Sequence, residues 1–267
     1  MTKTKFMYEE ISHLLDNFFE RKGINPNGLS MHSGKVEKGD IFLAYPGEKQ
    51  DGRNHIRQAI SSGAVLVIWE SRGFEWPKNL IVTNFPIEGL AKKIGYIADY
   101  FYQKPSQKIW ITGVTGTNGK TSCSTWIAGS LNKLGFPTAN IGTLGCHFKN
   151  FRVSNENTTP DPISLHKNLE IFIENGATGA VIEASSHGLS QGRVEGVRFD
   201  TALFTNLSRD HLDYHGTMDN YGRAKSRLFS WPFLKTIVVN VDDSFGQGLV
   251  KNAKNNEVDV ISYGKDK

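Results

Sequence analysis

The sequence predicts an α/β protein of two domains, in which a small N-terminal α/β domain precedes a P-loop-type domain with a mostly parallel sheet flanked by helices. Strand and helix patterns alternate from residue 109 onward, which is typical of a parallel sheet with helices on both faces. A glycine-rich turn separates the first of these strands from the helix that follows it. The polar segment 103–108, interrupted by a proline, indicates a boundary. We therefore expect domains at 1–105 and 106–267, since 267 residues suffice for two.

The N-terminal domain is expected to begin with a helix over residues 6–19, because six apolar residues recur there at helical spacing. They are Phe6, Ile11, Leu14, Leu15, Phe18 and Phe19. Short apolar runs predict strands at 41–45, 65–69 and 80–82. Apolar residues between Pro86 and Tyr102 again recur at helical spacing. Because proline suits the first turn of a helix, we expect a helix there.

In the second domain the same patterns predict alternating elements. Strands are expected at 109–112, 138–142, 179–184, 201–204, 235–241 and 257–262, and helices at 120–134, 162–175, 217–229 and 244–254. Between 145 and 153 the pattern changes to that of a hairpin or loop. The sequence stops just after a strand, which we interpret as a fragment or as a domain still to come.

Composition excludes several classes of protein. Hydrophobic content of 38% and charged content of 22% are those of an ordinary soluble globular protein. A net charge of +4 without any lysine or arginine run argues against a nucleic-acid partner. Acidic residues stand where a signal peptide would have its apolar core, and no apolar run approaches membrane-spanning length, so we expect a cytoplasmic protein without a membrane partner. The two cysteines form no metal-spaced pair.

The turn at residues 113–121 has the layout of a phosphate-binding loop. Glycines let backbone N–H groups converge on an anion, and the N-terminus of the following helix adds partial positive charge. Lys120 would reach the outer phosphates, and the hydroxyl of Thr121 would ligate Mg²⁺. The general pattern has glycine five places before Gly119, where this chain has Val114. A bare Gly-Lys-Thr is more often an ordinary turn into a helix, but the flanking strand and helix favour nucleotide binding.

Unusual polar residues follow the predicted strands, where open α/β sheets bind ligands. Glu183 ends an otherwise apolar strand, which is costly unless the carboxylate is paired or binds a cation. It is either a Mg²⁺ ligand beside Thr121 or a cap of the next helix. Residues 205–216 are dense in His, Asp and Arg. A single histidine there is more often structural, but together with Glu183 and the loop, His211 becomes a metal candidate.

Three further features allow a structural and a functional interpretation. Residues 157–162, Asn-Thr-Thr-Pro-Asp-Pro, are either a plain helix start or an anion site. Arg193, near Gln191 in a glycine-flanked loop, either clamps a carboxylate or is solvated. Lys225 lies on the predicted helix 217–229, and spacing alone favours a solvated surface position.

Six segments together resemble the Mur ligases, the ATP-dependent amide-forming enzymes of peptidoglycan precursor synthesis. They are Gly-Thr-Asn-Gly-Lys-Thr at 116–121, Thr-Thr-Pro at 158–160, Glu-Ala-Ser-Ser-His-Gly-Leu at 183–189, Gln-Gly-Arg-Val at 191–194, Asn-Leu-Ser-Arg-Asp-His-Leu-Asp-Tyr-His-Gly at 206–216 and Ala-Lys-Ser-Arg-Leu-Phe at 224–229. Within the family, the resemblance is to the members that add the third stem-peptide residue. It also accounts for Val114, because the family's loop normally lacks the extra glycine.

The resemblance implies a role for each matching position. The ATP phosphates would be held by Gly116, Thr117, Asn118, Gly119, Lys120, Thr121 and Ser122. Thr121 and Glu183 would hold one Mg²⁺, and His211 would hold a second together with Lys225, which is carbamylated in the family. Substrate contacts would come from Met31, Ser33, Glu48, Lys49, Gln50, Asn157, Thr158, Thr159, Ser185, Gln191 and Arg193. Lys120, Lys225 and His211 would be the catalytic residues.

The implied reaction is the ATP-dependent addition of a free diamino acid to UDP-N-acetylmuramoyl-L-alanyl-D-glutamate through an acyl phosphate. We expect meso-diaminopimelate as the amino acid, with L-lysine as the alternative, and a monomeric protein. The family's C-terminal Rossmann-like domain has no counterpart in the 267 residues. An alternative of another class is therefore a catalytically incomplete fragment that binds a nucleotide or UDP-sugar. A folylpolyglutamate-synthase-like ligase shares the loop and the modified lysine, but residues 1–105 and the loop of Gln191 and Arg193 argue against it.

Overall fold

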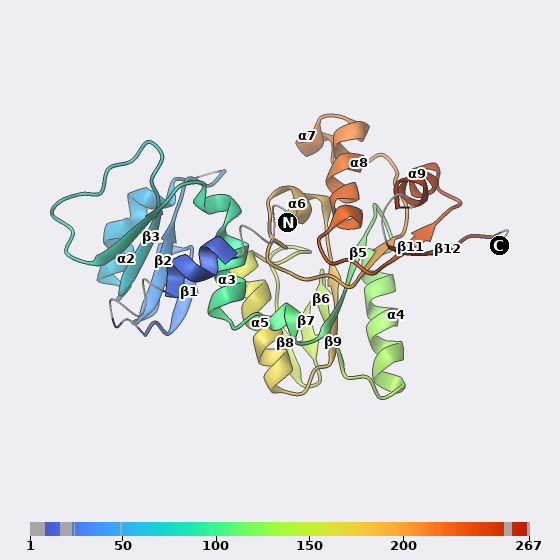
Figure 1. The fold of residues 1–267 in the computed structure, drawn as a ribbon, viewed down its shortest axis with the longest axis horizontal. Helices are drawn as coiled ribbons and strands as arrows, with labels where there is room; N and C mark the ends of the chain where they lie inside the picture. The colour runs from blue at the N-terminus through green and yellow to red at the C-terminus, as the bar shows by residue number, and fades with distance from the viewer. Residues whose placement is uncertain (1–8, 17–22, 24, 49, 254–257, 266–267) are drawn as a thin grey trace. The chain divides into compact units, whose positions relative to one another are not determined.

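The computed structural model describes residues 9–16, 23, 25–48, 50–253 and 258–265. The chain divides into two compact units, Met1–Tyr100 and Phe101–Lys267. Each unit is an α/β assembly with its own sheet, which confirms the predicted fold class (Figure 1).

The first unit contains a parallel four-stranded sheet in the order β1-β2-β3-β4. Its strands are β1 (Gly28–Ser30), β2 (Asp40–Ala44), β3 (Leu66–Glu70) and β4 (Thr83–Ile87). The two central strands are buried along their whole length, as their continuous apolar sequences require. Helix α2 (Ile56–Ser61) buries Ile56 and Ala59 against one face of this sheet. No pattern in the sequence indicated β1, which has only three residues.

Two predictions for the first unit were wrong in their bounds. The strand expected at 80–82 begins at Thr83, and Ile81 is 99% exposed instead of lying in the sheet. The helix expected to begin at Pro86 is α3 (Ile94–Phe101), which a short 3-10 helix, Leu90–Lys92, precedes. Pro86 lies in β4 opposite Trp69. A proline is tolerated there because β4 is an edge strand, where one side of the backbone needs no ladder hydrogen bonds.

The predicted N-terminal helix is present over residues 9–16, where Ile11 and Leu15 are buried and Leu14 is half-buried. Phe6, Phe18 and Phe19, which belong to the same prediction, lie outside the described residues.

The second unit contains an eight-stranded sheet in the order β12-β11-β10-β5-β9-β6-β7-β8. Its strands are β5 (Trp110–Thr115), β6 (Thr138–Gly142), β7 (Gly145–Phe148), β8 (Phe151–Val153), β9 (Gly179–Glu183), β10 (Thr201–Phe204), β11 (Thr236–Asn240) and β12 (Asp259–Tyr263). All neighbours are parallel except the β6-β7-β8 segment, which is the predicted hairpin excursion.

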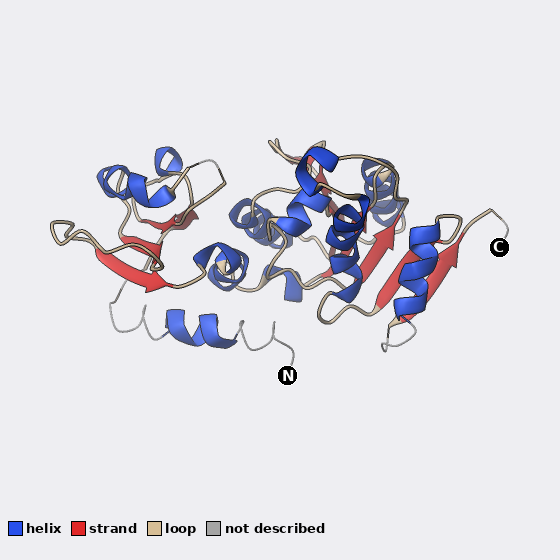
Figure 2. Cartoon of the chain, turned by 90° about the horizontal axis from the view of Figure 1, so that it is seen from above, coloured by secondary structure: helices blue, strands red, loops and turns tan. Residues whose placement is uncertain are grey.

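Helices cover both faces of this sheet, as the alternating sequence predicts. They include α4 (Lys120–Lys133), α5 (Pro162–Glu174), α8 (Met218–Ser226) and α9 (Ser244–Ala253). In β5, Ile111 points to the large core that contains α5 and α9 residues, whereas Val114 points to the smaller core under α4. Figure 1 shows α4 and α5 on opposite sides of the sheet, and Figure 2 shows α9 beside the last strands.

The register brings the carboxyl ends of the central strands to one edge. Val114 of β5 pairs with Glu183 at the end of β9, and Thr115 pairs with Phe204 at the end of β10. The loops that leave these three strands therefore begin side by side, which positions the candidate site.

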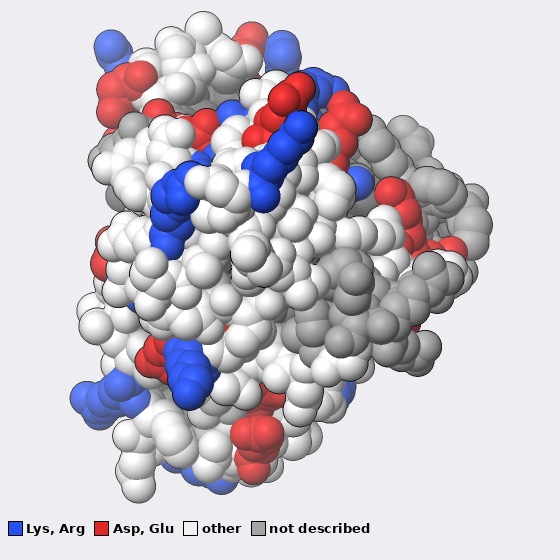
Figure 3. Space-filling view, turned by 90° about the vertical axis from the view of Figure 1, so that its left-hand side faces the viewer, with Lys and Arg blue, Asp and Glu red and all other residues white. Residues whose placement is uncertain are grey.

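Charged side chains of both signs are interspersed among uncharged ones on the face that Figure 3 shows. Among the described residues, every helix is too short or too polar to span a bilayer.

We expect Phe172→Ala to lower the free energy of unfolding by about 3–5 kcal/mol, because it would leave a cavity in the core. Phe172 is 0% exposed and packs against the Phe148 ring at a centroid distance of 5.8 Å. Urea denaturation would measure the change. As a matched control, Phe136→Ala removes a ring that is 54% exposed and should cost no more than about 1 kcal/mol. Equal losses in the two variants would contradict this assignment of the core.

Candidate functional site

The glycine loop between β5 and α4 needs glycine at two positions for different reasons. Gly116 has φ of +152°, and a Cβ there would lie 1.9 Å from Thr205 Oγ1. Gly119 precedes the helix in the left-handed conformation, with φ of +85°. Both positions exclude ordinary side chains, the first by close approach and the second by backbone conformation.

The segment after β10 holds this loop in place. Asn206 O accepts a 2.8 Å hydrogen bond from Thr117 N, and Asn206 Oδ1 accepts one of 3.1 Å from Asn118 N. Thr205 Oγ1 donates to Asn118 O at 2.6 Å. The amides of Thr117 and Asn118 are thus already bonded within the protein. The N–H groups that remain for an anion are those of the first turn of α4, which begins without a side-chain cap.

Lys120 folds back over the loop. Its Nζ donates to Gly116 O at 3.0 Å and to Thr117 O at 2.9 Å. Burial lowers the pKa of Lys120, while the charges of Glu183 and Asp210 act in the opposite direction. The ammonium therefore sits at the loop, where a phosphate would be expected to draw it away from the carbonyls.

Lys225 is 1% exposed, so the solvated surface position that its spacing favoured is wrong. Its Nζ donates to Gly116 O at 2.7 Å and lies 4.4 Å from the centre of the Tyr221 ring. Burial, aided by the charge of Lys120, lowers the pKa of Lys225 to about 7. A buried amine with such a pKa is about half neutral, and therefore nucleophilic, near pH 7.

Glu183 is 1% exposed and is held by hydrogen-bond donors from two other segments. Thr121 Oγ1 donates to its Oε2 at 2.9 Å, and Thr143 N donates to its Oε1 at 2.9 Å. The alternative in which Glu183 caps the next helix is wrong. Ser185 caps α6 (Ser186–Ser190) by accepting a hydrogen bond from Gly188 N at 3.0 Å.

Two of the predicted substrate residues of this unit, Ser185 and Arg193, contact a third, Thr159, which is fully buried. Thr159 Oγ1 donates to Glu183 O at 2.6 Å and accepts from Ser185 N at 3.0 Å. Arg193 Nη1 donates to Thr159 O at 2.9 Å. Asp161 caps α5, as the helix-start interpretation expects. Of the other residues in this prediction, Asn157 is exposed and Thr158 and Gln191 are half-buried.

His211 lies in a cluster of aromatic rings near Lys225. It precedes α7 (Leu212–His215) in the left-handed conformation, with φ of +51°. Its ring centre is 4.9 Å from that of His187 and 6.0 Å from that of Tyr221, the ring that Lys225 contacts. Tyr221 also bonds Thr117 Oγ1 through its hydroxyl at 3.2 Å. His211 and Lys225 thus both lie around one tyrosine that touches the loop.

Sequence reasoning missed four residues of this arrangement. They are Gly142, Thr143, Asn206 and Tyr221. Tyr221 carried a signal, since an aromatic residue four positions before Lys225 lies on the same side of a helix. Asn206 belongs to the segment 206–216 that carries the resemblance, although no role was expected of it. Gly142 and Thr143 carried no signal, because their contacts join segments far apart in the sequence.

The donor set fits a magnesium ion that also has ligands from a bound phosphate. Within the described residues, no three His, Cys, Asp or Glu side chains lie close enough together to hold a metal by themselves. The hydroxyl of Thr121 and the carboxylate of Glu183 offer oxygen donors of the kind that Mg²⁺ prefers, and they are in mutual contact. Mg²⁺ is commonly bound by one or two carboxylates with phosphate oxygens and waters.

In the first unit, the remaining predicted residues follow the neighbouring strands β1 and β2. Met31 and Ser33 are half-buried, and Tyr45 joins the two loops through a 3.9 Å contact between its hydroxyl and Met31 Sδ. Glu48 and Gln50 are exposed, and Lys49 lies outside the described residues.

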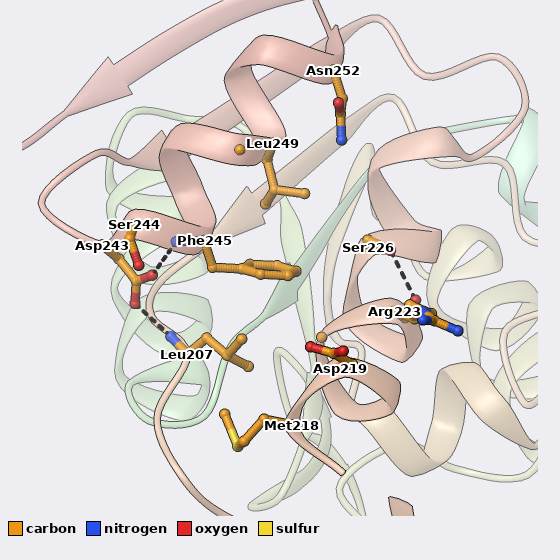
Figure 4. Close-up of a pocket in the computed structure, with 12 residues that line it drawn as sticks. Leu207, Met218, Asp219, Arg223, Ser226, Asp243, Ser244, Phe245, Leu249 and Asn252 are labelled. Atoms are coloured by element: carbon orange, nitrogen blue, oxygen red, sulfur yellow. Dashed lines mark hydrogen bonds between the residues drawn. The ribbon is translucent and has the colours of Figure 1, made fainter.

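A separate pocket lies between α8 and α9 (Figure 4). Phe245 and Leu249 of α9 face Met218 and Asp219 of α8 across it. Its margin is fixed by Asp243, whose carboxylate accepts hydrogen bonds from Leu207 N at 2.7 Å and Phe245 N at 2.8 Å. None of the predicted site residues lines this pocket.

A comparison with protein families matches residues 114–267 to the Mur ligase middle domain and residues 26–102 to the Mur ligase family catalytic domain. The first match alone covers more than half of the chain. The chain belongs to the Mur ligase family.

Curated and solved members of the Mur ligase family agree with this. The chain is 45% identical over 236 residues to the UDP-N-acetylmuramoyl-L-alanyl-D-glutamate--2,6-diaminopimelate ligase of Nitrosomonas europaea, covering 88% of this chain and 45% of the relative. A solved structure of a ligase of the same name superposes with a TM-score of 0.76 at 34% identity, over 91% of this chain and 49% of the other.

The MurF ligase of Thermotoga maritima, solved in complex with ADP, has a TM-score of 0.61 at 20% identity, over 90% of this chain and 51% of that one, and shows the fold alone. The chain spans about half the length of the relatives that it matches.

We expect Lys225 to titrate near pH 7 in CO₂-free buffer, far below ordinary lysines, because burial penalises its charged form. Between about pH 7 and the ordinary lysine value, the unfolded state holds the proton that the folded state has released. Stability should therefore rise with pH across this window relative to Lys225→Met. NMR of ¹³Cε-labelled lysine would measure the titration, and Lys225→Met would assign the resonance. An ordinary lysine midpoint would contradict the expectation.

Proposed function

We propose that the chain acts in the ATP-dependent joining of meso-diaminopimelate to UDP-N-acetylmuramoyl-L-alanyl-D-glutamate, in the cytoplasm and as a monomer. The observation that carries the proposal is the 45% identity to a ligase of that name over 88% of this chain. The contacts among the glycine loop, Glu183 and Lys225 support it independently. Addition of L-lysine is the alternative within the family.

The loop from Gly116 to Ser122 would bind the phosphates of ATP. Support comes from the free first turn of α4 and from Lys120, whose ammonium lies at the loop. The Thermotoga maritima ligase, which shares the fold, was solved in complex with ADP. Lys120 would exchange its two carbonyl partners for phosphate oxygens as the nucleotide binds.

Thr121 and Glu183 would hold one Mg²⁺, and His211 with Lys225 a second. Bound Mg²⁺ would neutralise charge on the phosphates and on the attacking carboxylate, which otherwise repel each other. As an ammonium, Lys225 cannot ligate a metal. Its low pKa favours addition of its neutral amine to CO₂, which yields a carbamate that can.

In this proposal the D-glutamate side-chain carboxylate attacks the γ-phosphate of ATP, giving ADP and an acyl phosphate. The amine of the incoming amino acid then displaces phosphate and forms the amide. Asn157, Thr158, Thr159, Ser185, Gln191 and Arg193 would contact the muramoyl-dipeptide, and Met31, Ser33, Glu48, Lys49 and Gln50 its UDP group. The task of these residues is to bring the carboxylate into line with the γ-phosphate.

A second candidate function follows from the length of the match, since the chain spans about half of its relatives. In this alternative the 267 residues bind the UDP-substrate and nucleotide without completing a turnover. An assay of the 267-residue chain with ATP, the UDP-dipeptide and a diamino acid separates the two, because only the first yields ADP and product.

We expect Lys120→Ala and Glu183→Ala each to abolish ADP release by the naturally encoded enzyme, a loss of at least about 10²-fold. The first variant removes a cation at the phosphates, and the second removes a ligand of the Mg²⁺ that would neutralise them. A coupled assay of ADP release would measure it. Lys133→Ala, at the far end of α4, is a control that should retain activity. Near-normal rates in both site variants would refute the assignment.

We expect Lys225→Ala to be inactive but partly rescued by a short carboxylate such as acetate or formate, because the added anion can replace the carbamate. ADP release as a function of added carboxylate would show the rescue. Lys120→Ala is the matched control, since the role of its lost cation cannot be taken over by an anion. Full activity of Lys225→Ala without added acid would remove carbamylation from the mechanism.

A further inference from the structure

Thr143 is a second anchor of the Glu183 carboxylate, and the sequence motifs do not include it. Its N–H donates to Glu183 Oε1 at 2.9 Å, and its hydroxyl donates to Glu183 Oε2 at 3.2 Å. Thr121 contacts only Oε2 of the same carboxylate, at 2.9 Å. Thr143 therefore contacts both carboxylate oxygens, whereas Thr121 in the first turn of α4 contacts one.

The backbone around Thr143 is shaped for this contact. Gly142 ends β6, the strand next to β9, and a Cβ on Gly142 would lie 1.9 Å from Glu183 Oε1. Only glycine lets the carboxylate approach the turn closely enough to accept the Thr143 N–H. The Thr143 side chain itself is exposed, so its packing contributes little to the core.

The Thr143 hydroxyl has a second partner on the substrate side. It lies 3.1 Å from Thr158 Oγ1 and can donate there instead of to Glu183. A hydroxyl carries one proton, so Thr143 donates to only one of these oxygens at a time. An ionised carboxylate is the stronger acceptor, so the proton goes to Glu183 as long as nothing competes for Oε2.

A cation bound at Glu183 would change which oxygen accepts the hydrogen bond from the Thr143 hydroxyl. Thr121 contacts Oε2 of Glu183, so a metal bound by both residues would compete with Thr143 for this oxygen. The Thr143 hydroxyl would then donate its hydrogen bond to Thr158 Oγ1. Thr158 would then accept from Thr143, and its own proton would be free to donate to an oxygen of a bound substrate.

We propose that Thr143 is a positioning residue that couples metal–nucleotide binding at Glu183 to binding of the UDP-dipeptide at Thr158. The inference rests on the proposed function, because it takes both ligands from it. Mg²⁺·ADP at the loop raises the affinity for the UDP-dipeptide, and by reciprocity the UDP-dipeptide raises the affinity for Mg²⁺·ADP.

The test is a set of calorimetric titrations of UDP-N-acetylmuramoyl-L-alanyl-D-glutamate into the whole chain, with and without saturating Mg²⁺·ADP. The readout is the ratio of the two dissociation constants. For one hydrogen bond in a charged network we expect a ratio on the order of tenfold in the unaltered chain. Thr143→Val keeps the backbone N–H but lacks the hydroxyl, and its ratio should fall to about one.

Thr143→Ser restores the hydroxyl and should restore the ratio. Thr158→Val removes the second acceptor of the Thr143 hydroxyl and should also lower the ratio to about one, although it leaves the contacts of Glu183 unchanged. Leu144→Ala changes an exposed neighbour in the same turn and should leave the ratio unchanged.

The outcomes separate the inference from the function on which it rests. If the unaltered chain binds both ligands but Thr143→Val keeps the full ratio, or if the unaltered ratio is already one, the coupling is overturned and the proposed function stands. If Thr143→Ser loses the ratio as Thr143→Val does, the hydroxyl is not the cause and the inference fails. If the unaltered chain binds neither ligand, both proposals fail.

Discussion

The candidate site depends on one buried carboxylate at the end of a parallel strand. Glu183 is almost fully excluded from solvent, and an ionised carboxylate in that position is stable only if donors or cations surround it. The strand order supplies them, because β9 lies between β5 and β6. Thr121 reaches Glu183 from the first turn of α4, which follows β5, and Thr143 reaches it from the turn after β6. Closing the loop against the segment after β10 in turn requires Gly116.

Much of this arrangement could be predicted from the sequence, because its signals are local. The alternating apolar runs after residue 109 predicted the sheet, and parallel strands bring their carboxyl ends together whatever their order. The glycines around Lys120 and the lone acid at Glu183 identified two of the segments that meet. The predicted ends of helices and strands were less accurate where one residue type fits two kinds of element. Pro86 suits a helix start and an edge strand equally, and only the strand order decides between them.

The remainder could not be predicted from composition and periodicity, because it depends on contacts across the sheet; for Lys225, only the family resemblance indicated a role in the site. Lys225 sits on a helix whose sequence resembles a solvated face, yet its amine reaches a carbonyl 109 positions earlier in the chain. The contact of Thr143 could not be predicted either. Thr143 is an exposed residue in a turn, and Glu183 lies beside it only because of the register of β6 and β9. The burial of Lys225 and the hydrogen bonds of Lys225 and Thr143 depend on the order of the strands in the sheet, which composition and periodicity do not reveal.

The carbonyl of Gly116 is shared by two lysines, and this limits the charge that Lys225 can carry. Lys120 and Lys225 both donate to this one oxygen, and the charge of Lys120 helps to lower the pKa of Lys225. Two ammonium groups sharing an acceptor repel each other, so the site favours a neutral second amine. Addition of CO₂ to that neutral amine releases one proton to solvent. It would keep one N–H for the Gly116 carbonyl while turning an uncharged side chain into an anion. The new anion would then need a cation of its own, so modification of Lys225 and metal binding beside His211 would stabilise each other.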